Sequence, residues 1–356
     1  MKFSDIGSLR LGSQQLVETA FQTAQAMVSW FAAVQGQEYA QTKWGLGLRL
    51  PQLGDADIEK ELDDGHILRT HLLRPTWHFV ASEDIHWLLK LTAPRVNAAN
   101  AYMYRKLELD ASIFNRCNDI LIDTLQGGNH LTRDDLNTQF NRHNIEAKGH
   151  RLSYIMMAAE LAGIICSGRR QGNQFTYALL DERIQPRPAL DKDEALARLT
   201  RRYFESRGPA TVHDFSTWSG LGLGECKKGI AMVRDHLQQE TIGDDAYCFT
   251  GNPIPQRREH QPIHLLPIYD EFIMGYKDRS PIFEFKSQLK ESAGLRHDCM
   301  IVSGGQVIGT WKRLAKPKSL QLEYEFFSPL DPHQSKAFDA AVNRLQAFTQ
   351  LAIQHG

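Results

Sequence analysis

Residues 207–224 read Arg-Gly-Pro-Ala-Thr-Val-His-Asp-Phe-Ser-Thr-Trp-Ser-Gly-Leu-Gly-Leu-Gly, and this stretch decides the fold that the sequence predicts. Its Arg-Gly-Pro break ends a helix expected over 193–206, because glycine and proline interrupt helical backbone. Thr211 is a residue type that caps a following helix, and Ser219-Gly220 supply a turn before a third helix over 224–237. Three helices joined by two short turns are typical of a helix-turn-helix domain.

A β-hairpin is predicted directly after the third helix. Residues 239–242 and 246–249 are rich in strand-forming residues, and Gly243-Asp244-Asp245 between them is a turn signal. A helix-turn-helix with an added strand pair is the winged-helix arrangement. We therefore predict a winged-helix module in this part of the chain.

The same order of elements recurs twice upstream. In the copy over about 111–180, the expected helices are 113–125, a segment capped by Thr132, and 150–162, and the expected strands are 164–166 and 175–179. A looser first copy has expected helices at 14–34, 39–48 and 55–62 and expected strands at 67–73 and 76–80. A helical segment over 82–103 is expected to link the two copies.

The C-terminal part is expected to be rich in strands and to end with a helix. The predicted strands lie near 264–266, 300–302, 306–312 and 320–327, and the predicted helix covers 335–352. The fold class is therefore α+β, with three tandem winged-helix modules, a C-terminal β-rich subdomain and a closing helix. A linker with two prolines at 181–188 supports one boundary. The predicted domains are 1–110, 111–188, 189–258 and 259–356.

The composition is that of an ordinary soluble protein, with 42% hydrophobic and 23% charged residues. The first 15 residues lack the apolar segment of a signal peptide. No apolar run approaches the length of a membrane span. We therefore expect a cytoplasmic protein that has no membrane contact and that associates with the nucleoid when it binds DNA.

The cysteines and histidines do not form a metal motif. Five cysteines are scattered along the chain without close pairs. This pattern indicates a reducing compartment and argues against a disulfide scaffold or a zinc site. The HExxH and CxxC spacings are absent. We expect no metal and no other cofactor.

A pair of glutamines, Gln35 and Gln37, follows an apolar segment that has helical spacing. We expect Gly36 to end the helix and to release the glutamines from helical geometry, in which residues two apart point away from each other. Two neutral amides at a helix end can hold one water or one leaving group. A polar helix end followed by a loop gives the same pattern, so the residues alone leave both interpretations open.

Several short motifs extend from about residue 30 to about residue 313. They are the glutamine pair, Trp44–Arg49, Leu73–Val80, Leu265–Asp270, Gly275–Arg279 and Gly305–Lys312. Their order and spacing resemble those of the winged-helix DNA glycosylases of the AlkZ/YcaQ type. In that family a glutamine–apolar–glutamine motif carries catalysis in one branch, and an aspartate replaces the second glutamine in the other branch.

The resemblance implies that Gln35 and Gln37 are the catalytic residues of a monofunctional DNA glycosylase. Here glycine stands where the family usually has alanine or a larger apolar residue, and Glu38 replaces a common aspartate. Glu38 is a weaker candidate for an auxiliary base. We expect the substrate to be double-stranded DNA that carries cationic alkylated purines of the N7-alkylguanine type. The resemblance also implies that a β-hairpin in the DNA cleft is needed for activity.

Basic residues of the second module are candidate DNA contacts. Lys148 and Arg151 lie before and on its third helix, and Arg169 and Arg170 lie at the predicted wing tip. Third helices and wing tips are where such modules contact phosphates. A solvated surface patch explains the same residues equally well.

Three further groups of basic residues complete the candidate DNA contacts. Arg69, His71, Arg74 and His78 alternate along the first predicted hairpin, which would place one set on one face. Lys277 and Arg279 lie near the adjacent carboxylates Asp270 and Glu271, so acid/base chemistry and structural ion pairing are both open there. Lys312, Arg313, Lys316 and Lys318 form a cluster expected between two strands.

Two other functions remain open at this point. The net charge of −1 is unusual for a protein that binds nucleic acid, so any basic surface must be local. A winged-helix regulator without enzymatic activity would share the fold, and the near-zero net charge is the one feature that favours a protein-interaction scaffold. A regulator is typically a smaller dimer that reads two half-sites. Three modules in one chain fit a cleft that surrounds DNA better, so we expect a monomer.

Overall fold

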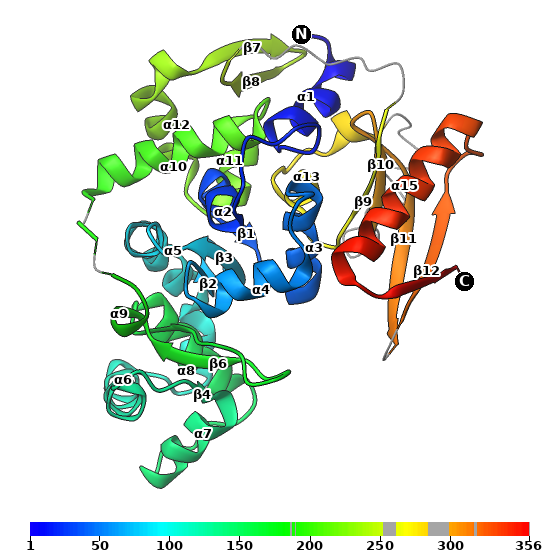
Figure 1. Ribbon diagram of the computed structural model, residues 1–356. Helices are drawn as coiled ribbons and strands as arrows, with labels where there is room; N and C mark the ends of the chain where they lie inside the picture. Colours follow the sequence, from blue (N-terminus) through cyan, green and yellow to red (C-terminus); the bar gives the residue numbers. More distant parts are fainter. Residues whose placement is uncertain (186, 189, 252–260, 284–298, 317–318, 356) are drawn as a thin grey trace.

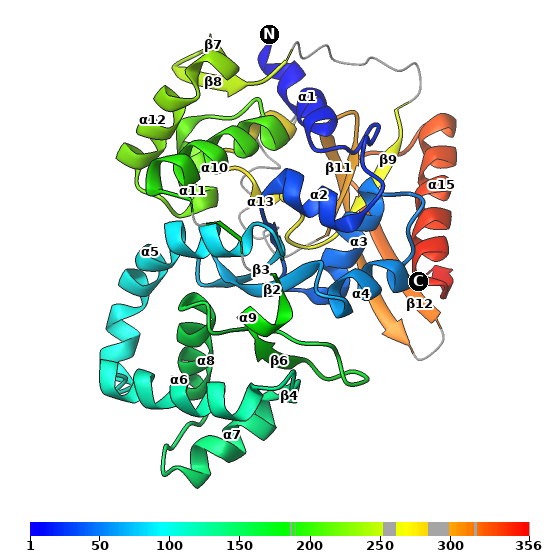
Figure 2. The ribbon, with the colours of Figure 1, turned by 60° about the vertical axis from the view of Figure 1, so that its left-hand side comes forward.

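The computed structural model describes residues 1–185, 187–188, 190–251, 261–283, 299–316 and 319–355. In Figure 1 the N-terminal elements occupy the centre, and the C-terminal sheet lies to their right. The helices and strands of residues 111–179 lie below this centre, and those of residues 192–249 lie above it. Figure 2 shows the same arrangement from the side. The N-terminal elements are therefore in contact with each of the other groups.

The N-terminal group contains the helices and the hairpin that the sequence predicts, with one correction. Its elements are η1 (Phe3–Asp5), α1 (Ile6–Ser13), α2 (Ala24–Phe31), β1 (Val34–Gln35), α3 (Tyr39–Arg49), α4 (Asp55–Asp63), β2 (Ile67–Leu72) and β3 (Thr76–Ala81). The single helix expected over 14–34 is wrong. The helix α2 begins only after Thr23, whose side chain accepts from the Ala26 N–H. It ends at Phe31, because Ala32 has a φ of 62° and leaves helical geometry.

The next group forms around a long linking helix, α5 (Ile85–Lys106). Its elements are α6 (Ala111–Leu125), β4 (Leu131–Thr132), α7 (Arg133–Arg142), α8 (His150–Leu161), β5 (Ile165–Ser167) and β6 (Thr176–Leu179). Thr132 caps α7 as predicted, and its hydroxyl accepts from the Asp135 N–H at 3.2 Å. The strands form a three-stranded sheet in the order β4-β6-β5.

The third group contains the quoted stretch, and its elements agree closely with the prediction. They are α9 (Leu180–Arg183), α10 (Lys192–Arg207), α11 (Val212–Ser219), α12 (Leu223–Met232), η2 (Arg234–His236), β7 (Gln238–Ile242) and β8 (Asp245–Phe249). The Thr211 hydroxyl accepts from the Asp214 N–H at 3.1 Å and so caps α11. Gly220 ends α11 with a φ of 72°, a conformation that favours glycine. Two details differ: α9 occupies part of the expected linker, and α12 ends five residues before the predicted 237.

The C-terminal elements build one five-stranded sheet. They are β9 (Ile263–Leu266), α13 (Glu271–Met274), η3 (Ser280–Ile282), β10 (Cys299–Ser303), β11 (Gln306–Lys316), β12 (Ser319–Phe326), α15 (Pro332–Thr349) and β13 (Ala352–His355). The strand order is β13-β12-β11-β10-β9. The sequence did not predict β13, which pairs parallel with β12. The boundary expected at 258/259 lies outside the described residues.

Within the part of the chain that the structure describes, hydrophobic cores hold these groups together. One core joins the N-terminal helices to the C-terminal sheet, for example through Trp44 and Leu265. A second joins the first hairpin and α5 to the third group, through residues such as Leu72 and Trp218. The second group has a core of its own. The chain is therefore α+β. The β2–β3 hairpin, which pairs with β1, packs against two of these cores. The assignment of three winged-helix modules stays a prediction.

Candidate active site

The glutamine pair does not end a helix, which corrects that prediction. Gln35 is the last residue of β1, which pairs antiparallel with β3, and it lies opposite His78. The Gly36 N–H continues this pairing by donating to the Trp77 carbonyl at 2.7 Å. Gln37 lies in the bend between β1 and α3. Both glutamines are therefore outside helical geometry, in which side chains two residues apart point away from each other.

The close approach of β3 explains why glycine separates the two glutamines. A Cβ atom added to Gly36 would lie 2.9 Å from Cδ1 of Phe79 and 3.1 Å from the carbonyl carbon of His78. These distances are shorter than ordinary contacts, so a larger residue would push β1 away from β3. The glycine that departs from the family pattern is thus suited to the packing of this chain.

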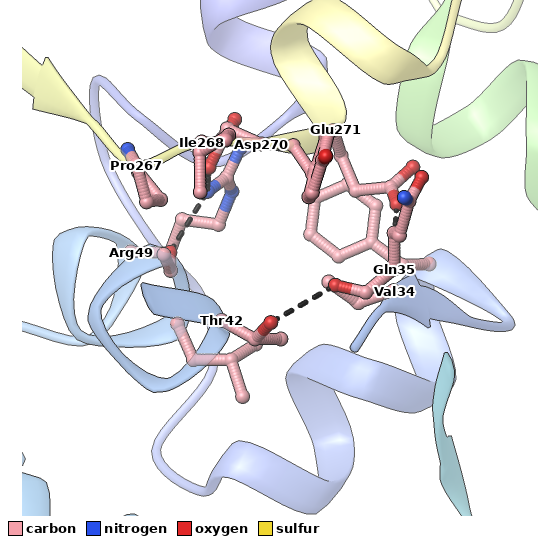
Figure 3. A pocket seen from close by; sticks show the side chains of 12 residues that line it. Val34, Gln35, Thr42, Arg49, Pro267, Ile268, Asp270 and Glu271 are labelled. Atoms are coloured by element: carbon pink, nitrogen blue, oxygen red, sulfur yellow. Dashed lines mark hydrogen bonds and ion pairs between the residues drawn. The ribbon is translucent and has the colours of Figure 1, made fainter. Parts of the chain in front are cut away.

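Gln35 is 6% exposed and lines a pocket between β1, α3 and residues 267–271. The cavity has a volume of about 10 Å³, which is room for about one water molecule. Figure 3 shows Gln35 with Glu271 on one side and Thr42 on the other. The Gln35 N–H donates to Oε1 of Glu271 at 2.9 Å, and its carbonyl accepts from the Thr42 hydroxyl at 3.0 Å. The side-chain Oε1 accepts from Nη2 of Arg74 at 3.3 Å.

Gln37 is held by its backbone but not by its side chain. Arg69 donates from Nε to the Gly36 carbonyl at 2.9 Å and from Nη2 to the Gln37 carbonyl at 3.3 Å. The Gln37 side chain is half-buried, and it has no hydrogen-bond partner among the described residues. The motif therefore presents one amide that is fixed and one that is available to a substrate or a water.

A buried ion pair on the far wall of the pocket fixes Asp270. Arg49 donates to both carboxylate oxygens of Asp270, at 2.8 and 2.9 Å, and both side chains are 2% exposed. Figure 3 shows this pair opposite Gln35. The sequence pointed instead to the basic residues that follow Asp270 closely in the chain, and this expectation is wrong. A carboxylate that is occupied on both oxygens by one guanidinium has a structural role.

Glu271 belongs to a second buried ion pair, directly beside Gln35. Arg207 donates from Nη2 and Nε to Oε2 of Glu271 at 2.6 and 3.1 Å. The Trp218 indole donates to the same oxygen at 3.0 Å. The other oxygen of this carboxylate accepts from the Gln35 N–H, so all these donors converge on one group. Glu271 therefore connects the third group of elements to the backbone of the glutamine motif.

Lys43 is the lysine nearest to the glutamine pair in the sequence. Its side chain is 4% exposed, and Nζ lies 2.8 Å from Asp55 and 2.6 Å from Glu59. The Nζ atom is therefore occupied by two carboxylates and largely covered from solvent. The arrangement does not favour an amine nucleophile at this position.

The first hairpin does not present an outward basic face, which corrects that part of the prediction. His78 is fully buried, and its Nδ1 lies 2.9 Å from the Thr76 carbonyl. Burial lowers the pKa of His78 well below its usual range, with the charge of Arg74 acting in the same direction. His71 is also buried and pairs with Glu160. Neither imidazole is a surface contact for DNA in this structure.

The two arginines of the hairpin lie at its edge. The Arg69 guanidinium stacks over Trp77 at 4.2 Å and over Phe175 at 4.8 Å. Arg74 is half-buried and donates to the Trp218 carbonyl at 2.6 Å. Both arginines therefore make contacts within the protein, and their predicted contact with DNA stays untested.

The basic residues of the second group differ in their surroundings. Lys148 is exposed and lies 3.4 Å from Glu146, whereas Arg151 donates to the carbonyls of Leu107 and Glu108. At the tip of the β5–β6 hairpin, Arg169 is exposed and Arg170 is half-buried.

The tip of the β5–β6 hairpin contacts α4. Arg169 donates from Nε to the Asp63 carbonyl at 3.0 Å, and the Arg170 N–H donates to the Asp63 carboxylate at 3.0 Å. The Arg170 guanidinium lies 3.8 Å from Glu59. The predicted wing tip is thus held against the N-terminal group.

The last predicted cations lie on C-terminal elements. Lys277 is exposed, and Arg279 is half-buried with its Nε donating to the Ile273 carbonyl at 3.0 Å. Lys312 is exposed and Arg313 is half-buried. Lys312 and Arg313 lie inside β11, not between two strands as expected. Because successive residues of a strand face opposite sides, these two side chains point to different faces of the sheet. Lys318 lies outside the described residues.

Within the described part of the chain, no group of three or more His, Cys, Asp or Glu residues could hold a metal ion. No helix among the described residues is long and apolar enough to cross a membrane.

Local sequence patterns did not indicate the residues that hold the glutamine motif from distant parts of the chain. Arg49 and Arg207 pair with carboxylates that are 221 and 64 residues away in the chain. Local spacing carries no information about such pairs. The adjacent carboxylates Asp270-Glu271 were the one relevant feature of the sequence. Lys277 and Arg279 were the partners considered for them, whereas the structure pairs them with Arg49 and Arg207.

The chain matches a known protein family and a solved structure over most of its length. A family model described as DNA glycosylase AlkZ-like matches residues 28–348. The interstrand DNA cross-link repair glycosylase of Streptomyces sahachiroi is 23% identical over 326 residues, which cover 85% of this chain and 85% of that protein. The solved structure of the Streptomyces sahachiroi DNA glycosylase AlkZ is 19% identical, with a TM-score of 0.81 and a match that covers 100% of both chains.

These findings confirm two predictions from the sequence. The structural likeness shows a common overall fold. The family match confirms the resemblance that the motifs indicated, and with it a DNA N-glycosylase that acts in DNA repair. The chain belongs to the AlkZ-like family of DNA glycosylases.

Proposed function

We propose that this enzyme releases cationic alkylated purines, of the N7-alkylguanine type, from duplex DNA. The relative from Streptomyces sahachiroi is named for interstrand cross-link repair. Such a cross-link joins an alkylated base on each strand, so release of one of the two bases would separate the strands. We therefore include cross-linked purines in the proposed substrate class. The enzyme would act on chromosomal DNA, which agrees with the predicted cytoplasmic location.

The chemistry of this substrate explains why two amides are enough. A guanine alkylated at N7 carries a positive charge, and its bond to the sugar is weakened because the base leaves neutral. A water attacks the anomeric carbon, the bond to the base breaks with its electron pair on the base, and the water releases one proton to solvent. The products are a neutral base and an abasic sugar. Such a step needs placement and electrostatic stabilisation more than a strong acid or nucleophile.

The arrangement of Gln35 and Gln37 carries this proposal. The first amide is fixed beside a pocket, and the second has no partner among the described residues. Gln35 ends the strand that pairs with β3, and Gln37 lies in the bend that follows it. Neutral amides can donate and accept hydrogen bonds without a change of charge. Together they could hold a water and the substrate around the bond that breaks.

Exposed cations supply candidate contacts with the DNA backbone. Lys148, Arg169, Lys277 and Lys312 are exposed. Contacts of this kind release counterions, so duplex binding should weaken steeply as salt increases. The net charge of −1 means that such contacts act locally. We propose that the enzyme binds as a monomer.

The decisive test of the function is release of the base. The protein is incubated with a duplex that contains one N7-methylguanine, and the free base is separated and quantified against the rate of spontaneous loss. We expect N7-methylguanine and an abasic site in equal amounts. Salt-sensitive binding of the duplex without base release would favour a DNA-binding regulator, and failure to bind any duplex would favour a scaffold.

The reaction should proceed without a covalent link to the protein. A bifunctional glycosylase forms a Schiff base through an amine, and borohydride traps it. The nearest lysine in sequence, Lys43, is buried and paired with two carboxylates. We predict no trapped protein–DNA adduct and no strand cleavage beyond that caused by heat or alkali. An adduct that disappears in Lys43→Ala would overturn the water-attack mechanism and leave the glycosylase activity standing.

A further inference from the structure

The guanidinium of Arg74 bridges the third group of elements and the catalytic motif. Nη1 donates to the Trp218 carbonyl at 2.6 Å and to the Thr217 carbonyl at 3.3 Å, both near the C-terminal end of α11. Nη2 donates to Oε1 of Gln35 at 3.3 Å. The side chain is thus anchored at one end on helix carbonyls and contacts the glutamine at the other.

This contact determines how the Gln35 amide is oriented. A guanidinium has only donors, so it can form a hydrogen bond with the oxygen of an amide but not with its nitrogen. The oxygen of Gln35 is therefore directed towards Arg74, and the NH₂ group is directed away from it. The backbone of Gln35 is fixed as well, by Glu271 and Thr42.

The two glutamines consequently offer different chemical groups. Gln35 has its oxygen occupied and presents an NH₂ donor. Gln37 has no partner for its side chain among the described residues, so its oxygen can accept from a water. A water is made a better nucleophile by an acceptor for its proton than by a donor to its oxygen.

We propose that Arg74 is a positioning residue that fixes Gln35 as a hydrogen-bond donor to the substrate, and that Gln37 is the acceptor that orients the attacking water. This inference rests on the proposed function and divides its two glutamines into separate roles. Gln35 would donate to an acceptor on the base or the sugar-phosphate. Arg74 would act through Gln35 without contacting the reacting atoms.

The surroundings of Arg74 favour this role over a contact with phosphate. Three of its donor contacts are made inside the protein. Burial lowers the pKa of Arg74, and the charge of Glu271 partly offsets this effect. A guanidinium that is desolvated and engaged in this way has few donors left for DNA.

The first experiment separates positioning from binding. Arg74→Met is compared with Arg201→Met, a control at a half-exposed arginine that is paired within α10. We expect Arg74→Met to lower the single-turnover rate by about 10-fold to 100-fold. We expect its Kd for the duplex to change by less than about 3-fold and the salt dependence of binding to stay the same, whereas loss of a phosphate contact would lower the salt slope by about one.

If Arg74→Met does not fold, Arg74→Lys takes its place, since a lysine can reach the carbonyls of α11 but lacks the fork that also reaches Gln35. A Kd that rises with a reduced salt slope, or a rate within about 2-fold of the control, would overturn the inference.

The second experiment tests the division of roles. Gln35→Glu removes the NH₂ donor and retains acceptor oxygens beside Arg74, while Gln37→Glu retains the acceptor that the water needs. We expect Gln37→Glu to keep its single-turnover rate within about 10-fold of the parent enzyme and Gln35→Glu to lose about 100-fold. Equal losses in the two variants, or the reverse order, would contradict the assignment. Failure of the proposed function is distinguishable, because the parent enzyme itself would then release no base from the N7-methylguanine duplex.

Discussion

Replacing either of the proposed catalytic glutamines by alanine is expected to lower the rate of base release by about 100-fold to 1,000-fold, the effect of removing one positioned polar group from an active site. Gln35→Ala removes the fixed amide, and Gln37→Ala removes the unpartnered one. Both changes act on the step in which charge develops on the sugar. The rate is measured under single-turnover conditions with an N7-methylguanine duplex, after subtraction of spontaneous loss.

Folding and duplex binding should be almost unchanged in these variants. The Gln37 side chain has no partner among the described residues, so its loss should have little effect on stability. Gln35→Ala removes one hydrogen bond with Arg74, which is worth about 1 kcal/mol. The exposed Gln126, on the second group of elements, offers a matched control as Gln126→Ala. Full activity in the double variant Gln35→Ala/Gln37→Ala would remove the catalytic assignment.

Most regular elements could be predicted because their signals are local. Thr132 and Thr211 cap the helices that the sequence assigned to them. The hairpin turns and the break before Pro209 carry Gly, Pro and Asp residues with known turn preferences. Boundaries differed by a few residues, as where α12 ends at Met232.

The strand β1 could not be predicted for a physical reason. It has two residues, too few for an alternating pattern, and it exists because β3 pairs with it from far along the chain. The apolar residues before it have helical spacing, and the helix ends early because Ala32 adopts a left-handed φ. Similarly, β13 forms by pairing with β12, not from a pattern of its own.

Sequence motifs located the glutamine pair, but they did not predict the residues that hold it in place. Gln35 and Gln37 were found through the resemblance of short segments to a family. The contacts that hold Gln35 come from Arg74, Glu271 and Thr42, which are brought together only by the tertiary fold. Alternation along the first hairpin predicted an outward basic face, but both hairpin faces pack on cores, one through Ile67 and Ala81 and the other through Leu68 and Val80.

Removing Glu271 is expected to cause the largest loss of stability among single substitutions near the site. Breaking a buried ion pair from one side costs about 3 to 5 kcal/mol, because the remaining charge is left buried without a partner. In Glu271→Ala the Arg207 guanidinium, which is fully buried, would lose its only carboxylate among the described residues. A typical domain is stable by only about 5 to 15 kcal/mol. Denaturant unfolding followed by tryptophan fluorescence measures this difference.

Removing Arg207, the other partner of this ion pair, should cause a similar loss of stability, whereas removing an exposed ion pair should not. Arg207→Ala also leaves the carbonyls of Phe31 and Ala33 without the donor that holds them at 3.0 Å, just before β1. A matched surface control is Lys228→Ala, whose pair with Asp193 at 2.6 Å is half exposed and worth less than about 1 kcal/mol.

The ion pair also links stability to activity, because Oε1 of Glu271 accepts from the Gln35 N–H. Glu271→Gln keeps the shape of the side chain and one acceptor oxygen, but it removes the charge that Arg207 requires. We expect Glu271→Gln to be less destabilised than Glu271→Ala and to lose activity even at temperatures where it is fully folded, because β1 is no longer held at the pocket. Unchanged unfolding free energy in Glu271→Ala would mean that the Arg207 guanidinium reaches solvent when its partner is removed. Full activity of a folded Glu271→Gln would mean that the pairing of β1 with β3 alone is enough to position Gln35.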